Sequence, residues 1–307
     1  MTLAMVSQGM RFFRTYIEIS NICNLQCTFC PEVERDKKVL TSDQFRKILK
    51  EVLPHTDQVC LHLMGEPLAH PEFEKILEIC NEEKAVIHLT TNGTFLSKFG
   101  FDTFLKAPCL RQINFSLHSF KDNYPDKDIR PYLFDILQFS KQALVEKPEL
   151  YINYRLWNLA TTTESKAANQ DIIDHITEFF QISVNERVDV ALNKSKNLLG
   201  RIYFHFDTRF DWPSFNDPIR SEHGFCHALS QQIGIHADGT VVPCCFDKEA
   251  GIPLGNVLEQ SFEEVLNSPR LKKIRDGFQK HKLVEDLCQR CTYITRFDKK
   301  LAPTLPL

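Results

Sequence analysis

Three cysteines near the start of the chain have the spacing of a metal site. Cys23, Cys27 and Cys30 form a C-x3-C-x2-C pattern directly after an apolar stretch. Thiolates are soft ligands, so this cluster suits iron–sulfur chemistry or zinc. A structural zinc site needs a fourth ligand nearby, and the nearest carboxylates, Glu18 and Glu32, are not obvious ones. A [4Fe–4S] cube held by three cysteines would instead leave one iron open to another ligand.

A second set of cysteines lies in the C-terminal quarter. Cys226 precedes residues 233–242, whose pattern and Asp-Gly turn predict a β-hairpin, and Cys244 and Cys245 follow that hairpin. Cys288 and Cys291 form a C-x2-C pair. Four of these five thiols would be enough to ligate all the irons of a second cluster, or to bind one zinc ion. The remaining cysteines have no partner at metal spacing and are expected to be small buried hydrophobes: Cys60, Cys80 and Cys109.

The elements that must position these thiols alternate along the chain. Strand-like and helix-like segments follow one another from residue 15 to about 192, which predicts βα units and a parallel sheet. The expected strands are residues 16–19, 58–64, 86–90, 112–117, 150–156 and 188–192. The expected helices start at Thr41, cover residues 72–80, 101–105, 133–145 and 171–180, and start again at Ser261. Counting strands alone does not separate a partial barrel from a doubly wound sheet.

Residues that could hold a ligand follow several of the expected strands. In parallel α/β folds the chemistry lies at the C-terminal ends of the strands, where this chain has Gly65, Glu66, Thr91, Asn92, Ser116 and Arg155. Glu66 could pair with an ammonium group through a charge-assisted hydrogen bond. A plain Gly-Pro turn would explain the same stretch without a ligand, and Asn-Gly is a common turn. Arg155 could equally be an ordinary surface residue.

The first motif resembles that of the radical S-adenosylmethionine (SAM) enzymes. The resemblance rests on Cys23, Cys27 and Cys30, with Phe29 before the last cysteine, after the first strand. It implies an open (β/α)6 TIM-like partial barrel and a [4Fe–4S] cluster whose open iron binds the amino and carboxylate groups of SAM. It also implies cleavage of SAM by one electron to a 5′-deoxyadenosyl radical, which abstracts hydrogen from a substrate.

The same resemblance implies roles for residues at the strand ends. Met64-Gly65-Glu66-Pro67 is similar to the family's Gly-Gly-Glu-Pro, with Met64 in place of the first glycine, and would hold the SAM amino group. Thr91 and Asn92 match a stretch near the SAM pocket, and Ser116 matches a ribose or carboxylate contact. By the same match, the Phe29 backbone would contact the adenine. Arg155 would bind the SAM carboxylate or the substrate.

The C-terminal cysteines resemble the extension called SPASM, or its shorter version, twitch. Cys226, Cys244, Cys288 and Cys291 would hold one auxiliary [4Fe–4S] cluster, with Cys245 as the spare thiol, because the family ligand follows the hairpin proline directly. The expected domains are therefore residues 1–215, a radical SAM core, and residues 216–307, an auxiliary-cluster domain. Residues 204–213 are expected to link them and to line the substrate pocket, or simply to pack between them.

Composition narrows the class of protein further. The chain has 307 residues, a net charge of −3 and 43% hydrophobic residues, typical of a globular protein. The charge argues against a broad nucleic-acid-binding face, and no apolar run is long enough for a membrane span. The first ten residues lack the features of a signal peptide. The eleven cysteines then favour metal ligation in the reducing cytoplasm over disulfides.

The resulting hypothesis is a radical SAM oxidoreductase that oxidises or modifies a peptide or protein side chain. The alternative substrate is a small molecule, such as an aminocyclitol or a cofactor precursor. A flavodoxin or ferredoxin would reduce the enzyme, and the auxiliary cluster would conduct electrons. RNA modification fits the acidic charge less well. The rival of another class is a non-catalytic zinc or iron–sulfur scaffold, which needs neither an open iron nor Glu66.

Overall fold

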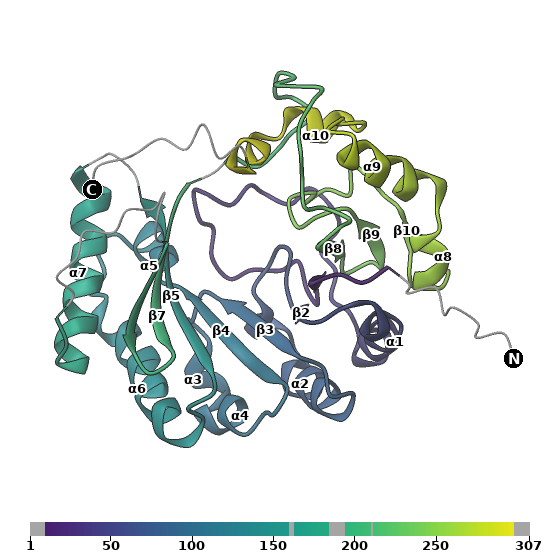
Figure 1. Cartoon of the computed structure of the whole chain (residues 1–307). Helices are drawn as coiled ribbons and strands as arrows, with labels where there is room; N and C mark the ends of the chain where they lie inside the picture. Colours follow the sequence, from purple (N-terminus) through teal and green to yellow (C-terminus); the bar gives the residue numbers. More distant parts are fainter. Residues whose placement is uncertain (1–9, 160–162, 184–193, 210, 298–307) are drawn as a thin grey trace, which may run out of the picture.

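The computed structural model describes residues 10–159, 163–183, 194–209 and 211–297. Its centre is a curved sheet with strand order β10-β9-β8-β1-β2-β3-β4-β5-β7-β6 (Figure 1). All pairings from β8 to β7 are parallel, whereas β9, β10 and β6 pair antiparallel at the edges. The strands are β1 Arg14–Ile17, β2 Val59–Cys60, β3 Ile87–Thr91, β4 Leu110–Ser116, β5 Tyr151–Leu159, β6 Ser195–Leu199, β7 Ile202–Thr208, β8 Gln232–Ile235, β9 Thr240–Val242 and β10 Gly255–Asn256.

The helices that connect the parallel strands lie on the outer side of this sheet (Figure 1). They are α1 Ser42–Val52, α2 Phe73–Glu82, α3 Leu96–Phe99, α4 Phe101–Leu105, α5 His118–Asn123, α6 Arg130–Glu146 and α7 Thr163–Phe180. Beyond the β8–β9 hairpin follow α8 Phe262–Leu266, α9 Pro269–Gln279 and α10 Asp286–Arg290. Short 3-10 turns cover Leu53–His55, Pro67–Ala69 and Thr292–Phe297. Within the described ranges, every helix falls short of the length or apolar character needed to cross a bilayer.

Capping fixes where two of the helices begin, as the sequence predicts. The Thr41 side chain accepts a hydrogen bond from the Gln44 N–H, and the Gln44 side chain accepts one from the Thr41 N–H. Ser261 and Glu264 form the same reciprocal box before α8. Each box satisfies N–H groups that the first helical turn leaves unpaired. The predicted helix starts at Thr41 and Ser261 are therefore confirmed.

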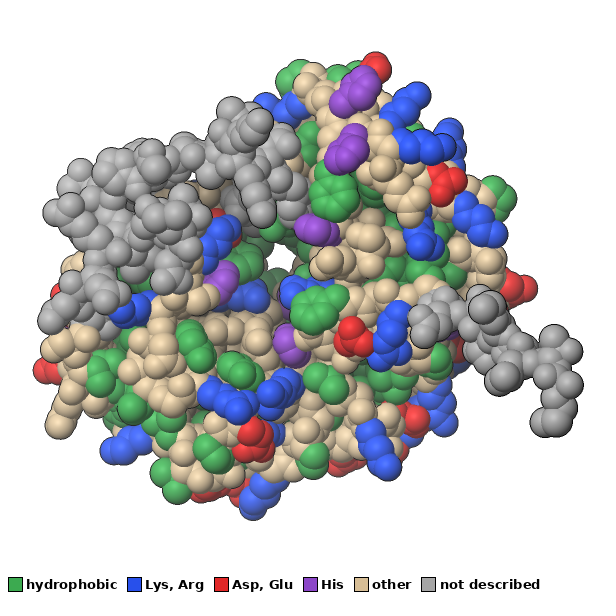
Figure 2. All heavy atoms as spheres, viewed as in Figure 1, with side chains coloured by type: hydrophobic (Ala, Val, Ile, Leu, Met, Phe, Trp, Pro, Cys, Tyr) green, Lys and Arg blue, Asp and Glu red, His purple; other side chains and the backbone are tan. Residues whose placement is uncertain are grey.

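The two faces of the sheet differ in chemistry because side chains alternate along each strand. On the outer face, Ile113, Tyr154 and Phe204 are fully buried in the hydrophobic core. The inner face carries polar side chains and borders an opening. In the space-filling view this opening is flanked by Lys, Arg and His side chains (Figure 2). The fold thus places a polar lumen inside an apolar shell.

The end of the parallel series differs from the sequence prediction. The expected strand at residues 188–192 lies outside the described residues. Ile202–Thr208 occupies the position beside β5 as β7, so residues 204–208 are a core strand and not a linker. β8 also pairs in parallel with β1, and the sheet therefore continues across the expected domain boundary at residue 215. Of the predicted strand at residues 58–64, only Val59–Cys60 is a strand, because the chain stops pairing with the neighbouring strands before it turns at Gly65.

Candidate metal and cofactor site

The loop after β1 presents the first three cysteines at the surface of the lumen. Cys23 and Cys30 are exposed and Cys27 is partly buried. The Cys30 N–H donates to the Cys27 carbonyl at 3.0 Å, which curls this part of the loop. α5 anchors the loop from the side, since Asp122 accepts from the Thr28 N–H at 2.5 Å and from its hydroxyl at 2.7 Å.

The electrostatics of these thiols fit a cationic cluster. Although Cys23 and Cys30 are exposed as residues, the surrounding protein removes their sulfurs from much of the water. This desolvation raises the pKa of Cys23 to about 11. Desolvation and then the neighbouring Cys27 and Cys23 thiols raise the pKa of Cys30 to about 12. Iron would supply the positive charge that keeps all three as thiolates. Three N–H groups lie against the sulfurs: Asn123 Nδ2 at 3.1 Å from Cys27, Leu25 N at 3.4 Å from Cys23 and Asn92 Nδ2 at 3.9 Å from Cys23.

Glu66 is a buried carboxylate close to these thiols. It is 2% exposed and is among the charges that raise the pKa of Cys23. It accepts hydrogen bonds from the Thr91 hydroxyl at 2.7 Å, the Asn92 N–H at 2.7 Å and the Leu68 N–H at 2.9 Å. Burial nevertheless raises the pKa of Glu66 to about 7, and no ion pair joins it to a described Lys, Arg or His. A ligand ammonium would supply the missing counter-charge.

Gly65 brings the Glu66 segment against the cysteine loop. Its φ is +78°, and an added Cβ would lie 2.3 Å from the Ser20 carbonyl oxygen. The Glu66 N–H then donates to the Ile22 carbonyl at 2.9 Å. Only glycine combines this backbone conformation with such close contact. The sequence reveals the Gly-Glu pair, whereas the contact with residues 20–22 depends on tertiary structure.

Thr91 and Asn92 hold other residues of this site in place through hydrogen bonds. The Thr91 hydroxyl is committed to Glu66, and it also accepts from the Gly93 N–H at 3.0 Å. The Asn92 side chain donates to the Asn24 side chain at 3.0 Å, next to Cys23. Thr91 therefore fixes the carboxylate, whereas Asn92 joins the carboxylate to the cysteine loop.

The other predicted ligand contacts lie at the far strand ends. Ser116 and Arg155 are register partners on β4 and β5. The Phe29 ring lies 4.7 Å from the His118 ring, and the Phe29 carbonyl accepts from the Trp212 indole N–H at 3.2 Å. Sequence reasoning missed His118, because a lone His carries no spacing signal, whereas Trp212 lies within residues 204–213, the segment expected to line the substrate pocket or to pack between the domains.

Glu18 is a buried carboxylate whose hydrogen-bond partners lie outside the cysteine loop. Its two oxygens accept from Arg35 Nη2 at 3.0 and 3.1 Å, and one accepts from the Met64 N–H at 3.1 Å. The Ala237 N–H also donates to it at 3.2 Å, from the turn after β8. Glu18 thus joins β1, the segment before Gly65 and the C-terminal hairpin, and its oxygens are committed to these donors.

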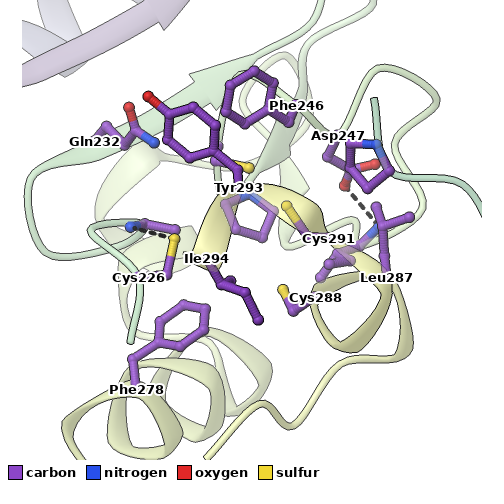
Figure 3. Close-up of a pocket in the computed structure, with 15 residues that line it drawn as sticks. Cys226, Gln232, Phe246, Asp247, Phe278, Leu287, Cys288, Cys291, Tyr293 and Ile294 are labelled. Carbon is purple, nitrogen blue, oxygen red and sulfur yellow. Dashed lines mark hydrogen bonds between the residues drawn. The ribbon is translucent and has the colours of Figure 1, made fainter. Parts of the chain in front are cut away.

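The C-terminal cysteines surround one apolar pocket (Figure 3). Cys226, Cys244, Cys288 and Cys291 all line it, together with Phe246, Phe278, Leu287, Tyr293 and Ile294. Figure 3 shows Cys226, Cys288 and Cys291 around the same space. Cys245 instead packs with Tyr16, Cys60, Leu63 and Val242.

These four pocket thiols influence one another. Burial and then Cys291 raise the pKa of Cys226 to about 11. Burial raises the pKa of Cys288 far above its usual value, with Cys226 and Cys291 adding to the effect. Thiolates buried in an apolar pocket need a positive charge nearby, and the iron of a cluster would supply it. Among the described residues, no three His, Cys, Asp or Glu side chains converge tightly enough for a single metal ion.

Family comparisons match both regions. A model of the radical SAM superfamily matches residues 17–140, and a model of SPASM, an iron–sulfur cluster-binding domain, matches residues 226–292. A probable GTP 3′,8-cyclase of Methanococcus maripaludis is 34% identical over 111 residues, 35% of this chain and 36% of the relative. A tungsten-containing aldehyde ferredoxin oxidoreductase cofactor-modifying protein of Pyrococcus furiosus is 31% identical over 86 residues, 27% of this chain and 24% of the relative. The chain thus spans about a third or less of these relatives.

Solved structures share the fold along most of the chain. SuiB of Streptococcus suis, bound to the precursor peptide SuiA, has a TM-score of 0.61 at 15% identity, covering 94% of this chain and 73% of SuiB. BtrN in complex with AdoMet and 2-DOIA has a TM-score of 0.54 at 15% identity, covering 92% and 93%.

The fold and the two family matches define an iron–sulfur enzyme with an α/β barrel-like sheet. The chain belongs to the radical SAM superfamily and carries a C-terminal SPASM domain. Its cofactors are SAM, a [4Fe–4S] cluster that binds SAM, and an auxiliary iron–sulfur cluster.

Proposed function

We propose that this enzyme abstracts hydrogen from a peptide or protein side chain and so oxidises or otherwise modifies it. When bound, the first cluster and SAM supply the one-electron cleavage that yields a 5′-deoxyadenosyl radical. Cys23, Cys27 and Cys30 hold that cluster. Glu66 holds the SAM amino group, while Gly65, Thr91 and Asn92 fix the Glu66 carboxylate in place. The Phe29 backbone contacts the adenine of SAM, and Ser116 contacts its ribose or carboxylate.

The buried Glu66 carboxylate is the observation that carries this proposal. It lies among neutral donors, beside Cys23, with its pKa raised and with no described cation as partner. A scaffold that only stored a metal would have no use for a buried acid in this state, because an uncompensated buried charge costs stability. A ligand that brings both an ammonium group and metal-binding groups satisfies the acid and the open iron together.

The second pocket has a separate role in the proposal. Cys226, Cys244, Cys288 and Cys291 hold the auxiliary cluster, with a protein thiolate on each iron. Such a cluster has no open position for SAM. When bound, this cluster would supply an acceptor for the electron released on oxidation of the substrate, and a reducing protein of the flavodoxin or ferredoxin kind would supply the electron that SAM cleavage consumes.

Two fold neighbours bear on the class of substrate. The fold neighbour SuiB was solved with a precursor peptide, which supports a peptide substrate. The alternative is a radical dehydrogenase or related enzyme that acts on a small molecule. BtrN matches this chain over nearly the full length of both proteins, which supports that alternative.

Iron analysis with a SAM-cleavage assay tests the proposal. The protein purified and reconstituted without oxygen should contain about eight iron and eight sulfide per chain, as two cubes require. With dithionite and SAM it should form 5′-deoxyadenosine. A protein that binds about two zinc ions instead and leaves SAM intact would be the non-catalytic scaffold.

A further inference from the structure

The lumen of the barrel contains charges to which the proposed function above gives no role. Parallel pairing places one row of residues side by side across β1 to β4: Tyr16, Cys60, His88 and Gln112. A second row lies side by side across β4, β5 and β7: Ser116, Arg155 and His205. Arg14 lies on the Tyr16 face, two residues earlier, and its Nη1 donates to the Tyr16 hydroxyl at 3.4 Å. The His62 ring lies edge-on to Tyr16 at 5.7 Å. The inner face therefore gathers two arginines and three histidines.

Neither arginine has an anionic partner among the described residues. No ion pair joins Arg14 or Arg155 to a described Asp or Glu. The Arg155 Nε is buried without any hydrogen-bond acceptor, and its guanidinium lies 4.4 Å from the centre of the Trp157 ring. The His62 Nδ1 is also buried and without a partner. Buried charges are normally paired, since removing them from water is costly.

The groups around these arginines do not supply the missing negative charge. Burial, with Arg155 and Arg14 adding to it, lowers the pKa of His62 to about 3. Burial and then Arg14 and Arg155 lower the pKa of His88 to about 4, and burial and then Arg155 lower the pKa of His205 to about 4. Burial raises the pKa of Cys60 to about 11. At neutral pH these groups are uncharged, and the two guanidiniums leave the described part of the lumen positive.

We propose that Arg14 and Arg155 bind an oxyanion group of the substrate, a carboxylate or a phosphate. The proposal rests on the function proposed above and names the chemistry of its substrate. Guanidinium groups match both oxyanions through paired N–H donors, and His62 can add a neutral hydrogen bond. Arg14 begins β1 and the cysteine loop follows its end. The anion is therefore held deeper in the barrel than the cluster loop, and the opposite end of the substrate faces SAM.

Calorimetric titration of the anaerobically reconstituted enzyme tests the site with defined probes. Inorganic phosphate and succinate are titrated separately in chloride buffer of matched ionic strength. At least one should bind, and Arg14→Gln should weaken it by about tenfold or more, the scale of a lost charge-assisted contact. Arg130→Gln is the matched control, because Arg130 is exposed on α6 and pairs with Asp128. Tighter phosphate binding would indicate a phosphate-bearing substrate, and tighter succinate binding a carboxylate.

Several outcomes would overturn the proposal. It fails if the enzyme cleaves SAM yet binds neither anion, a result that leaves the proposed function intact. It also fails if Arg130→Gln weakens binding as much as Arg14→Gln. Arg155→Gln must reduce anion affinity more than SAM affinity, and the reverse would assign Arg155 to SAM. Arg14→Lys controls for misfolding, because it keeps the positive charge. With iron content at the wild-type level it should bind the anion with intermediate affinity. Wild-type affinity would contradict recognition by the paired N–H donors of the Arg14 guanidinium.

Discussion

Replacing Glu66 by glutamine tests the assignment of the SAM amino group. The carboxylate accepts three hydrogen bonds from Thr91, Asn92 and Leu68 and carries the charge that an ammonium would meet. Glutamine keeps the size and one acceptor oxygen but removes the charge. A hydrogen bond to a charged group contributes about 1.5–3 kcal/mol, so the dissociation constant for SAM should rise about 10- to 100-fold.

The protonation of Glu66 adds a pH signature. Its pKa of about 7 in the folded protein lies above the usual 4.5. The folded state therefore holds the proton more tightly than the unfolded chain, and the stability of the cluster-free protein should fall as pH rises from about 4.5 through 7. The difference corresponds to roughly 3 kcal/mol. SAM affinity should change in the opposite direction, rising across pH 7 as the carboxylate forms, and Glu66→Gln should flatten both profiles.

The assay is SAM binding to the reconstituted protein by equilibrium dialysis without oxygen. Iron content must equal that of the wild type, so that a lost cluster is not mistaken for a lost contact. Glu74→Gln, an exposed carboxylate on α2, is the charge-matched control and should bind SAM normally. A dissociation constant within twofold of the wild type for Glu66→Gln, with clusters intact, would falsify the role of Glu66.

Three further outcomes follow from the described geometry. Cys244→Ala should lose about four iron per chain whereas Cys245→Ala keeps them, and the opposite iron contents would make Cys245 the ligand. Replacing both Cys288 and Cys291 by alanine should preserve some SAM cleavage but reduce substrate turnover much further. Unchanged product formation, with the EPR signal of the first cluster intact, would refute the electron-conduit role. Gly65→Ala should lower the free energy of unfolding by about 1–3 kcal/mol, measured by chemical denaturation, because of its positive φ and the Ser20 contact; unchanged stability would contradict the close approach.

The sequence predicts the local features of this fold well. Helix starts at Thr41 and Ser261 follow from capping residues, and the β8–β9 hairpin follows from its Asp-Gly turn. These signals lie within a few residues of the structure that they specify. The cysteine sets are equally visible, because ligand spacing is a property of the sequence itself.

Features that depend on distant pairing were not predicted. Nothing local shows that β8 pairs with β1, since that contact joins segments far apart in the chain. The strand at Ile202–Thr208 does have an alternating pattern, with Ile202, Phe204 and Phe206 on one face and Tyr203 and His205 on the other. The aromatic and charged composition of residues 204–213 instead favours a linker that lines the substrate pocket or a packed bridging segment.

The lumen residues illustrate the same limit. Arg14 lies on β1 and His88 on β3, whereas His62 follows β2, and in the sequence each could belong to an exposed face. Only the parallel pairing of β1, β2 and β3 brings these segments together, and the lack of an anionic partner becomes apparent only there. Asp122 of α5 was missed for the same reason, because its contact with Thr28 crosses about a third of the chain.

The most direct test of the central claim is 5′-deoxyadenosine formation by Cys27→Ala. Cys27 belongs to a three-thiol set with no spare ligand, whereas Cys109 is a buried thiol in the hydrophobic core and provides the control. After reconstitution, with dithionite and SAM, the wild type and Cys109→Ala should both form 5′-deoxyadenosine, and Cys27→Ala should form none. Formation by Cys27→Ala at the wild-type rate would contradict the assignment of the SAM-binding cluster to this loop.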